Sequence, residues 1–490
     1  MTERAIESEE RERLSLKTKI GYGMGDIYGG GAFVIIGTYY LYFLTDVLRI
    51  NPALAGTVIM ISKIWDAITD PLMGILSDRT RTRFGRRRIY FLIGIPLIFI
   101  SFLLLWYPVG FETEVQRFIY ALVSYMFFAT VITMVMVPYN ALAPELTLDY
   151  NERINLTSFR MFFSMFSSVV CAVLPLEVVK RFPSVKTGYV TMATFFGLLF
   201  AIPFIFTFLT TRERPEFWNS TSKLNFKEDF LEPFKNRSFL MVLFMYLFGF
   251  LTMDIVMAIL IYFTTYYLGK GGLTNYALGV LLITEILFIP LWAYIGRRFG
   301  KRTAFITGVL IWMFAMALSF VIGPKSTTTA IFIFSAIVGI GTGGVIVMIY
   351  SIFADIPDVD ELKTGKRREG TYSGLFTFMR KLSSAVGLFL ISNIIALAGY
   401  IPPREEVVNG TAKMVEQTQT PQFILALRIV FAVLPIGILT LCLIAAVKYP
   451  LTRKLHEKLK HLLELKRQKV ALGDEWTEEE EKLKKLLVGR

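Results

Sequence analysis

The sequence ALAGTVIMISKIWDAITDPLMGILSDRTRTRFGRRR, residues 53–88, joins a long apolar segment to a loop that contains six arginines. A helix needs about 20 mostly apolar residues to cross the hydrocarbon part of a bilayer, and residues 53–77 are long enough. Loops rich in arginine remain on the cytoplasmic side of the membrane. This stretch therefore predicts a helix that crosses a membrane and returns the chain to the cytoplasm.

The composition of the whole chain also indicates a membrane protein. Of its 490 residues, 54% are hydrophobic and 19% are charged, whereas a soluble protein has roughly 45–50% apolar and about 25% charged residues. A soluble enzyme, a disordered chain and a disulfide scaffold are thereby excluded. Twelve membrane-spanning segments are expected, at residues 20–46, 53–77, 89–108, 117–142, 154–180, 187–210, 238–268, 274–296, 303–322, 328–352, 371–400 and 423–448.

The few cysteines and histidines limit the chemistry that is possible inside the membrane. Cys171 and Cys442 both lie in apolar segments, so neither a disulfide framework nor a cysteine-based metal site is expected. His456 and His461 both lie in the polar C-terminal part. Imidazole is the usual proton carrier near neutral pH, so protons or cations inside the membrane must be handled by carboxylates and amines. We expect no cofactor.

The formal net charge of +13 could indicate nucleic-acid binding, but the basic residues are concentrated in every second loop. The basic segments are residues 78–88, the stretch 211–236, residues 296–302, residues 363–368 and the tail from 449. The positive-inside rule places all of these in the cytoplasm. The sequence therefore predicts a multi-pass protein of the plasma (inner) membrane with both termini cytoplasmic, an even number of spans and no nucleic-acid partner.

A short internal repeat supports a division into two halves. RFGRRR begins at residue 83 and RFGKR at residue 298, each after the second apolar segment of its half. Two related six-helix halves with the solute path between them are the architecture of the major facilitator fold. The predicted fold class is an all-α membrane protein with twelve transmembrane helices. Its expected parts are a cytoplasmic N-terminal tail (1–16), an N-terminal half (17–210), a cytoplasmic linker (211–236), a C-terminal half (237–448) and a cytoplasmic amphipathic tail (449–490).

The densest group of charges inside a span is on residues 53–77. Lys63, Asp66 and Asp70 follow one another at i, i+3 and i+7 and so share a helical face, where Thr69 can add a hydroxyl. Two carboxylates one turn apart cannot both stay ionised in a low dielectric unless a positive charge joins them. We interpret the pair as a site for Na⁺ or H⁺. The alternative is a static network that Lys63 alone closes, which leaves one carboxylate unbalanced.

Other polar groups inside the spans are candidates for contact with a solute, because each ionisable group there costs on the order of 2.5–3.5 kcal/mol on insertion scales. The candidates are Asp26, Tyr28, Asn140, Arg160, Asp254, Thr377 and Lys381. For Asp254, as for Glu285, a structural ion pair or a place in the cavity wall is an equally good interpretation.

Two further motifs have structural interpretations. In the arginine-rich loop, Asp78, Arg79, Arg86 and Arg87 are expected to orient and gate the protein, with arginines pairing to acids such as Asp78. The run GIGTGG at residues 339–344 is similar to a dinucleotide-binding loop, but it lies inside an apolar helix with no preceding strand. Close helix packing explains it better.

The sequence resembles that of a known family. IWDAITDPLMG (residues 64–74), followed by DRTRTRFGRRR, is similar to the second-segment signature of the glycoside–pentoside–hexuronide:cation symporters, the family of the melibiose and glucuronide permeases. The similarity extends over roughly residues 17–455. It includes GYGMGD (21–26), VPYNALAPELT (137–147), RMFFS (160–164), ADIPDVDELKTGKRREGTYS (354–373) and YPLT (449–452).

The resemblance implies roles for individual residues. Asp66 and Asp70 would bind the coupling Na⁺ or H⁺, Thr69 stands where the melibiose permease pattern has Asn, and Thr133 stands where it has Thr. Lys381 is similar to a Lys near the ion site and the sugar site of that family. Thr377 is similar to a sugar-contacting Thr, and Arg160 to a sugar-contacting Arg.

The chain also departs from the melibiose permease pattern. A Lys-Asp pair is replaced by Gly29-Gly30, an Asp by Met136, and two sugar-stacking Trp by Asn140 and Ile346. The ion half of the pattern is thus kept, and the galactoside half is mostly lost.

The expected function is secondary transport, in which a cation (Na⁺ or H⁺) drives symport of a sugar or glycoside by alternating access. The chain is not expected to be an enzyme, and its expected partners are the solute, the cation and the bilayer, with the protein a monomer. A cation-coupled lysophospholipid symporter is the alternative, because such symporters share a very similar WDAITDP run. A non-transporting sensor or an intramembrane hydrolase is disfavoured by the absence of a large polar domain and of membrane histidine.

Overall fold

The computed structural model describes residues 14–147, 150–213, 232–364, 369–408, 411–415, 417–467 and 474–489, and these residues are almost entirely helical. Most of the expected N-terminal tail (residues 1–13) and most of the expected linker (residues 214–231) lie outside the described residues.

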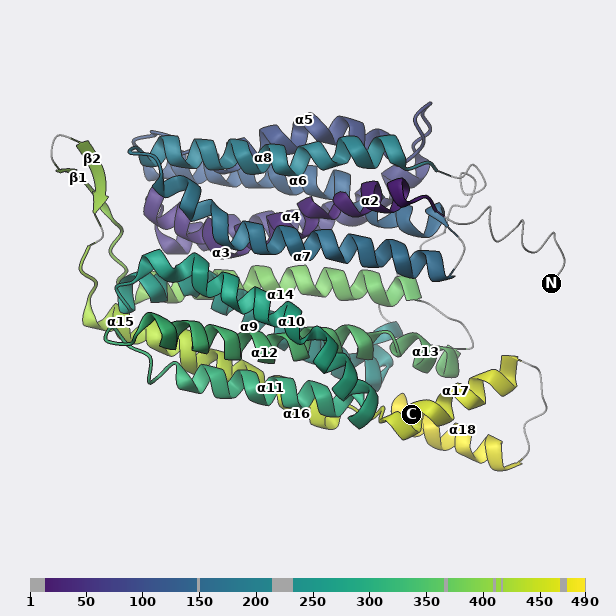
Figure 1. Cartoon of the computed structure of the whole chain (residues 1–490). Coiled ribbons are helices and arrows are strands. Elements are labelled where there is room, and N and C mark those ends of the chain that lie inside the picture. The colour runs from purple at the N-terminus through teal and green to yellow at the C-terminus, as the bar shows by residue number, and fades with distance from the viewer. Residues whose placement is uncertain are drawn as a thin grey trace.

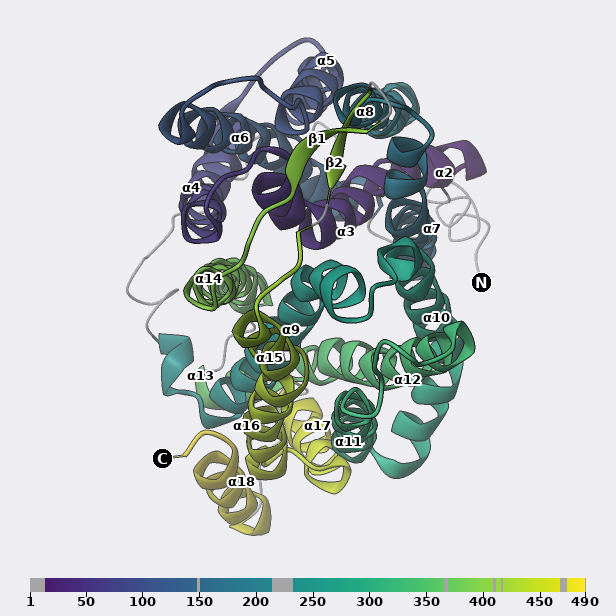
Figure 2. The same cartoon turned by 90° about the vertical axis from the view of Figure 1, so that its left-hand side faces the viewer.

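The helices fall into two consecutive groups, which Figure 2 shows on the two sides of the molecule. The first helix group comprises α2 (Leu16–Met24), α3 (Asp26–Tyr42), α4 (Pro52–Arg79), α5 (Arg88–Leu105), α6 (Glu114–Leu146), α7 (Tyr150–Lys180) and α8 (Val185–Thr210). The second helix group comprises α9 (Arg237–Tyr262), α10 (Thr274–Phe299), α11 (Lys301–Leu318), α12 (Thr328–Phe353), α13 (Ile356–Thr364), α14 (Glu369–Leu397), α15 (Pro421–Arg428) and α16 (Leu434–Lys448).

Eleven helical segments are long and apolar enough to cross a membrane in the part of the chain that the structure describes. The all-helical membrane class is therefore confirmed, while the expected count was twelve. The segment that makes the difference is α4, which has 28 residues. Lys63, Asp66 and Asp70 lower its hydropathy, although it runs beside α6 and α14 for much of its length.

The long helices run side by side, so the molecule has two distinct ends (Figure 1). Two further helices, α17 (Arg453–Arg467) and α18 (Asp474–Leu487), lie at the end where α2 begins, and we call this the tail end. The opposite end carries a two-stranded hairpin, β1 (Arg404–Val408) and β2 (Thr411–Val415), and we call it the hairpin end. The sequence analysis placed amphipathic helices after residue 449 but did not predict the hairpin.

The hairpin is antiparallel, with Arg404 opposite Val415 and Val408 opposite Thr411. It leaves the second helix group after α14 and returns at α15. Figures 1 and 2 both show it reaching across the end of the first helix group.

The two helix groups meet along α4 with α14, α7 with α10, and α3 with α9. Glycines allow the closest approaches. A Cβ atom at Gly56 would lie 1.6 Å from the Ser392 hydroxyl oxygen, and one at Gly279 would lie 2.8 Å from a Val173 methyl group. Both positions lie near the starts of α4 and α10, so the groups are in tight contact towards the hairpin end.

The glycine run of α12 allows close helix packing, as the sequence analysis expected. A Cβ atom at Gly339 would lie 2.3 Å from the Leu281 carbonyl oxygen of α10, and one at Gly341 would lie 2.7 Å from the Trp312 amide nitrogen of α11. Such small residues let helix backbones approach one another closely. Three helices of the second group therefore pack tightly around this run.

The repeated RFG motifs share one backbone feature, a glycine with positive φ. Gly85 has φ +107° and Gly300 has φ +94°, a region that residues with a side chain rarely adopt. A Cβ atom at Gly85 would also lie 2.5 Å from a Glu213 carboxylate oxygen. The two loops otherwise differ, because residues 80–87 separate α4 from α5 and Gly300 alone separates α10 from α11.

We expect Gly339→Ala to destabilise the protein, because the added methyl group meets a backbone carbonyl that cannot move without separating α10 from α12. Overpacking of this kind costs about 1–3 kcal/mol, which should lower the midpoint of thermal unfolding in detergent. Gly437→Ala in α16 is the matched control, since its Cβ atom meets nothing within 4 Å. Equal midpoints for the two variants would contradict this account of the packing.

Candidate site between the two helix groups

Asp66 and Asp70 of α4 are joined by one lysine from the other helix group. The Nζ atom of Lys381, on α14, lies 2.8 Å from Asp66 Oδ2 and 2.5 Å from Asp70 Oδ2. Hydrogen bonds between ionised groups are about twice as strong as neutral ones. Asp66 is 7% exposed, while the side chains of Asp70 and Lys381 are each 23% exposed. The bridge is therefore partly shielded from solvent, and it joins the first helix group to the second.

The other carboxylate oxygens converge on a hydroxyl. Thr133 Oγ1, on α6, lies 2.7 Å from Asp66 Oδ1 and 2.9 Å from Asp70 Oδ1. A hydroxyl has one proton and can donate to only one of the two carboxylates at a time. The positive charge of Lys381, which contacts both carboxylates, lets the second oxygen also lie close. Three oxygens in such an arrangement suit a hard cation or a shared proton.

The contacts differ from the static alternative, in which Lys63 alone balances the charge of the acid pair. Lys63 is half-buried on α4, and among the described residues it has no carboxylate within 4.0 Å. The partner of both acids is Lys381, which is 311 residues away from Asp70 in the chain. Spacing along α4 brings the acids together, but only the tertiary structure supplies their cation.

Thr69 does not join this cluster. Its hydroxyl donates to the Asp66 carbonyl oxygen at 3.1 Å, a bond within its own helix. Pro71, inside α4, lacks the amide hydrogen that would otherwise bond to the carbonyl one turn earlier. The structure thus brings together Asp66, Asp70, Thr133 and Lys381 of the five predicted cation-site residues.

A second buried ion pair lies next to Lys381. Arg380 donates to both carboxylate oxygens of Asp254, on α9, at 2.6 and 2.7 Å. Its guanidinium also lies 4.8 Å from the centre of the Phe250 ring and 5.5 Å from that of Phe33. Asp254 therefore forms a structural pair within the second helix group, which was one of its two interpretations. Arg380 was not among the predicted site residues.

Asp26 and Arg160 form the corresponding pair in the first helix group. Arg160 Nε lies 3.2 Å from Asp26 Oδ2, and its guanidinium carbon lies 5.5 Å from the Tyr139 ring centre. Asp26 is 4% exposed, whereas the Arg160 side chain is 29% exposed. The next residue after Tyr139 is Asn140, which is exposed. Arg160 is thus partly accessible, and Asn140 is exposed.

Two other predicted solute contacts lie in different surroundings. Tyr28 is fully buried, and its ring packs against Phe128, Phe200 and Phe204 in the aromatic core of the first helix group. Its hydroxyl has no hydrogen-bond partner in the described part of the chain. Thr377 is exposed on α14, one turn before Lys381.

The charged side chains considered above are four cations and four anions. The cations are Lys63, Arg160, Arg380 and Lys381, and the anions are Asp26, Asp66, Asp70 and Asp254. A cation added at the acid pair therefore leaves this set with one excess positive charge. A proton or Na⁺ at Asp66 and Asp70 has to compete with Lys381 for the same carboxylates.

The arginine-rich loop is held by acids, as expected, but mostly by two acids that the sequence analysis missed. Arg87 lies 3.0 Å from Asp78 and 2.8 Å from Glu145, and Arg86 also bonds to Glu145. Burial lowers the pKa of the Arg87 guanidinium, and Glu145 acts in the opposite direction. The side chain of Arg79 is exposed.

Glu213 closes this loop from the other side. Its carboxylate accepts hydrogen bonds from three consecutive backbone amides, those of Arg86, Arg87 and Arg88, each at 2.8 Å. Three such donors at the start of α5 are where a helix favours a negative charge. The sequence signal for Glu145 was its place in the run VPYNALAPELT, and Glu213 had no comparable signal.

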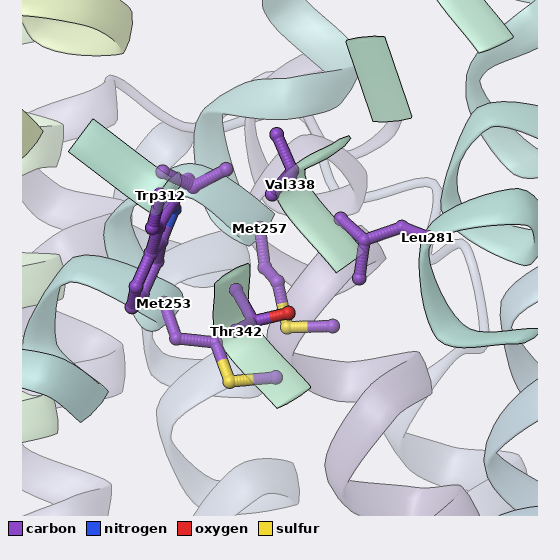
Figure 3. A pocket seen from close by; sticks show the side chains of 7 residues that line it. Met253, Met257, Leu281, Trp312, Val338 and Thr342 are labelled. Atoms are coloured by element: carbon purple, nitrogen blue, oxygen red, sulfur yellow. The ribbon is translucent and has the colours of Figure 1, made fainter. Parts of the chain in front are cut away.

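A small cavity lies apart from these charges, inside the second helix group (Figure 3). It is lined by Met253, Val256, Met257, Leu281, Trp312, Val338 and Thr342. It has room for no more than about one water molecule, which is too little for a sugar. Thr342 donates to Glu285 at 3.0 Å.

No group of three or more His, Cys, Asp or Glu side chains that could hold a metal ion occurs within the described ranges. The acid pair at Asp66 and Asp70 offers two carboxylates and the Thr133 hydroxyl as possible ligands of a cation.

The comparisons with known proteins agree on one kind of protein. The sequence pattern of the family described as MFS/sugar transport protein matches residues 21–453. The glucuronide carrier protein homolog of Escherichia coli K12 is 28% identical over 90% of this chain and 94% of its own length. A putative sulfoquinovose importer of the same strain is 30% identical over 80% of this chain and 84% of its own.

The fold is also found among solved structures. The D-xylose–proton symporter superposes with a TM-score of 0.59 at 16% sequence identity, over 77% of this chain and 90% of that structure. At this identity the likeness concerns the fold.

We expect Thr133→Val to weaken cation binding about tenfold or more, because a hydrogen bond to a charged group contributes about 1.5–3 kcal/mol. Thr69→Val is the matched control, since the Thr69 hydroxyl bonds only within its helix. The measurement is the dependence of the unfolding midpoint on Na⁺ concentration and on pH. An equal response of both variants would show that the convergence of oxygens on Thr133 does not matter for the cation.

Proposed function

Since the chain belongs to the MFS/sugar transport protein family, whose members are membrane transporters and not enzymes, we propose that it is a symporter that couples Na⁺ or H⁺ to a sugar or glycoside. The observation that carries this proposal is the group of Asp66, Asp70 and Thr133, whose oxygens converge from α4 and α6 while Lys381 reaches them from the other helix group. It combines a cation site with a contact between the two parts that must move.

Competition with Lys381 supplies the coupling. When a proton or Na⁺ binds at Asp66 and Asp70, it neutralises part of the charge that attracts the Lys381 ammonium. The bridge between α4 and α14 then weakens, and the two helix groups can rock about the site. Solute and cation stabilise the same arrangement, and the gain in affinity must be mutual.

The solute would bind between the helix groups. Arg160, Asn140 and Thr377 are accessible polar groups there, and a sugar is recognised through hydrogen bonds of this kind. The relatives whose names state a solute, a glucuronide carrier homolog and a putative sulfoquinovose importer, favour a sugar solute. No contact in the described residues favours a lysophospholipid, so we retain the sugar as the proposal.

We further propose that α4 also crosses the membrane, which brings the number of spans to twelve. Both termini would be cytoplasmic, because the basic loops lie at the tail end. On this topology the halves are residues 17–210 and 237–448, the tail end is inside the cell, and the hairpin end is outside. The protein would act as a monomer in the plasma (inner) membrane without a cofactor.

Asp66→Asn and Asp70→Asn should each abolish cation-driven uptake, because each removes a carboxylate that the cation needs. Uptake of labelled sugars into proteoliposomes with an imposed Na⁺ or H⁺ gradient measures this. Glu457→Gln, at an exposed carboxylate of α17, is the control and should transport at the rate of the unaltered protein. Gradient-driven accumulation that is undiminished in either aspartate variant would contradict the proposal.

The solute can be sought with purified protein. A sugar or glycoside that is the substrate should raise the midpoint of thermal unfolding, and should do so more strongly with the coupling cation present, by linkage. A screen of glycosides and lysophospholipids, each with and without Na⁺ and at two pH values, separates the two solute classes. Stabilisation by lysophospholipids alone would reject a sugar symporter.

A further inference from the structure

The hydrogen bonds that join the helix groups beyond the acid pair lie at the hairpin end in the described residues. The helices α3 and α9 lie side by side, and each ends there in a π-helical turn, over Phe43–Val47 and Phe263–Tyr267. Single π-helical turns are frequent at functional sites. The first turn contributes Thr45 and Asp46 to contacts with Tyr266 of the second turn and with Tyr262, the last residue of α9.

The centre of these contacts is a carboxylate that was not among the predicted site residues. Asp46 is 2% exposed, and its Oδ1 atom accepts a hydrogen bond from the Tyr266 hydroxyl of the other helix group. Thr45 Oγ1 lies 2.5 Å from Asp46 Oδ2 and 2.6 Å from the Tyr262 hydroxyl. Tyr400, just beyond α14, lies 3.0 Å from the Tyr266 hydroxyl oxygen.

A second contact joins the groups at the same end. Asn275, at the start of α10, donates from Nδ2 to Glu177 Oε1 at 2.8 Å and to the Val173 carbonyl at 3.1 Å. Glu177 and Val173 both belong to α7. The two helix groups are therefore held together at the hairpin end on both sides of the molecule.

The accessible polar groups lie on the other side of the acid pair. On α6, Asn140 is exposed, and it lies nearer the tail end than Thr133; on α14, Thr377 is exposed, and it lies nearer the tail end than Lys381. The exposed solute-contact candidates thus lie on the tail-end side of the acid pair, while the hydrogen bonds of Asp46, Tyr266 and Asn275 join the groups at the hairpin end.

We propose that Asp46 and Tyr266, supported by Thr45 and Tyr262, form a latch that keeps the hairpin end closed and must separate when the solute path opens there. Hydroxyl groups compensate for the burial of the carboxylate. When the groups separate, water replaces these hydroxyls, so the free energies of the closed and open states stay comparable. A contact of this kind can hold one state and still open in every cycle.

The latch deepens the proposed function, because it rests on alternating access, but it requires neither a particular solute nor a particular cation. Its test can therefore be made without either. Labelling of purified protein in nanodiscs exposes both ends, so the result is also independent of the proposed membrane topology.

Two glycines provide reporter positions that accept a cysteine. An added Cβ atom meets nothing within 4 Å at Gly37, on α3, or at Gly374, on α14. Gly37 lies one turn after Phe33 and two turns before Thr45, so it is farther from the hairpin end than the latch is. Gly374 lies two turns before Lys381, towards the tail end. The native Cys171 and Cys442 are replaced by Ala in both reporters, and both are fully buried.

Tyr266→Phe and Asp46→Asn should each raise the rate of maleimide labelling at Gly37→Cys about tenfold and lower the rate at Gly374→Cys. The opposite signs are expected because opening of one end closes the other. Tyr267→Phe is the matched control: it removes a hydroxyl from the same π-helical turn, where its ring contacts Phe263 and Arg428 of its own helix group. The control should label like the reporters without it.

Three outcomes would overturn the latch. Labelling rates in Tyr266→Phe equal to those of the control would show that the hydroxyl does not hold the end closed. A rise at both reporters would show that the change only loosens the fold. If the double variant Asp46→Asn, Tyr266→Phe labels at the product of the two single effects, the residues act independently. If Asp46→Asn does not fold, Tyr262→Phe takes its place beside Tyr266→Phe.

Undiminished gradient-driven transport in Asp66→Asn, together with the expected labelling changes in Tyr266→Phe, would contradict the coupling proposal and support the latch. Normal transport with no labelling change in Tyr266→Phe would reject the latch alone. The two proposals therefore fail separately.

Discussion

The bridge from Lys381 to Asp66 and Asp70 is the interaction on which the arrangement of the molecule depends. It joins the helix with the most membrane charges to the opposite group, and its cost in desolvation is offset only while all three charges stay together. Breaking such a bridge by removing one partner is strongly unfavourable, whereas substituting another cation for lysine is not. A contact with this property suits a part of the molecule that alternates between two partners.

The sequence predicted the features that depend on local pattern. Apolar length located the helices to within a few residues at most ends, and the spacing of Asp66 and Asp70 placed both acids on one face. The glycine run at 339–344 was correctly interpreted as helix packing, because the apolar residues around it left no place for a nucleotide. The basic loops predicted an orientation that no contact here tests.

The features that the sequence did not predict depend on residues far apart in the chain. Glu213 clamps three amides more than 120 residues earlier, and Asp254 is paired with an arginine 126 residues later. Asp46 looked like one acid at the end of a span, and only the approach of α9 shows what it contacts. The hairpin at Arg404–Val415 follows from pairing of two short polar strands, for which hydropathy gives no signal.

The tail helices rest on one group only in the contacts described. Arg453 donates to the Arg297 carbonyl at 3.1 Å, His456 lies 3.3 Å from Asp358, and Ser238 donates to the Leu487 carbonyl at 2.6 Å. The helix pair α17 and α18 is thus attached to the second helix group, α9–α16. A fluorophore fused after α18 would report the tilt of that half relative to a second fluorophore on the other half, and would do so without touching the path between them.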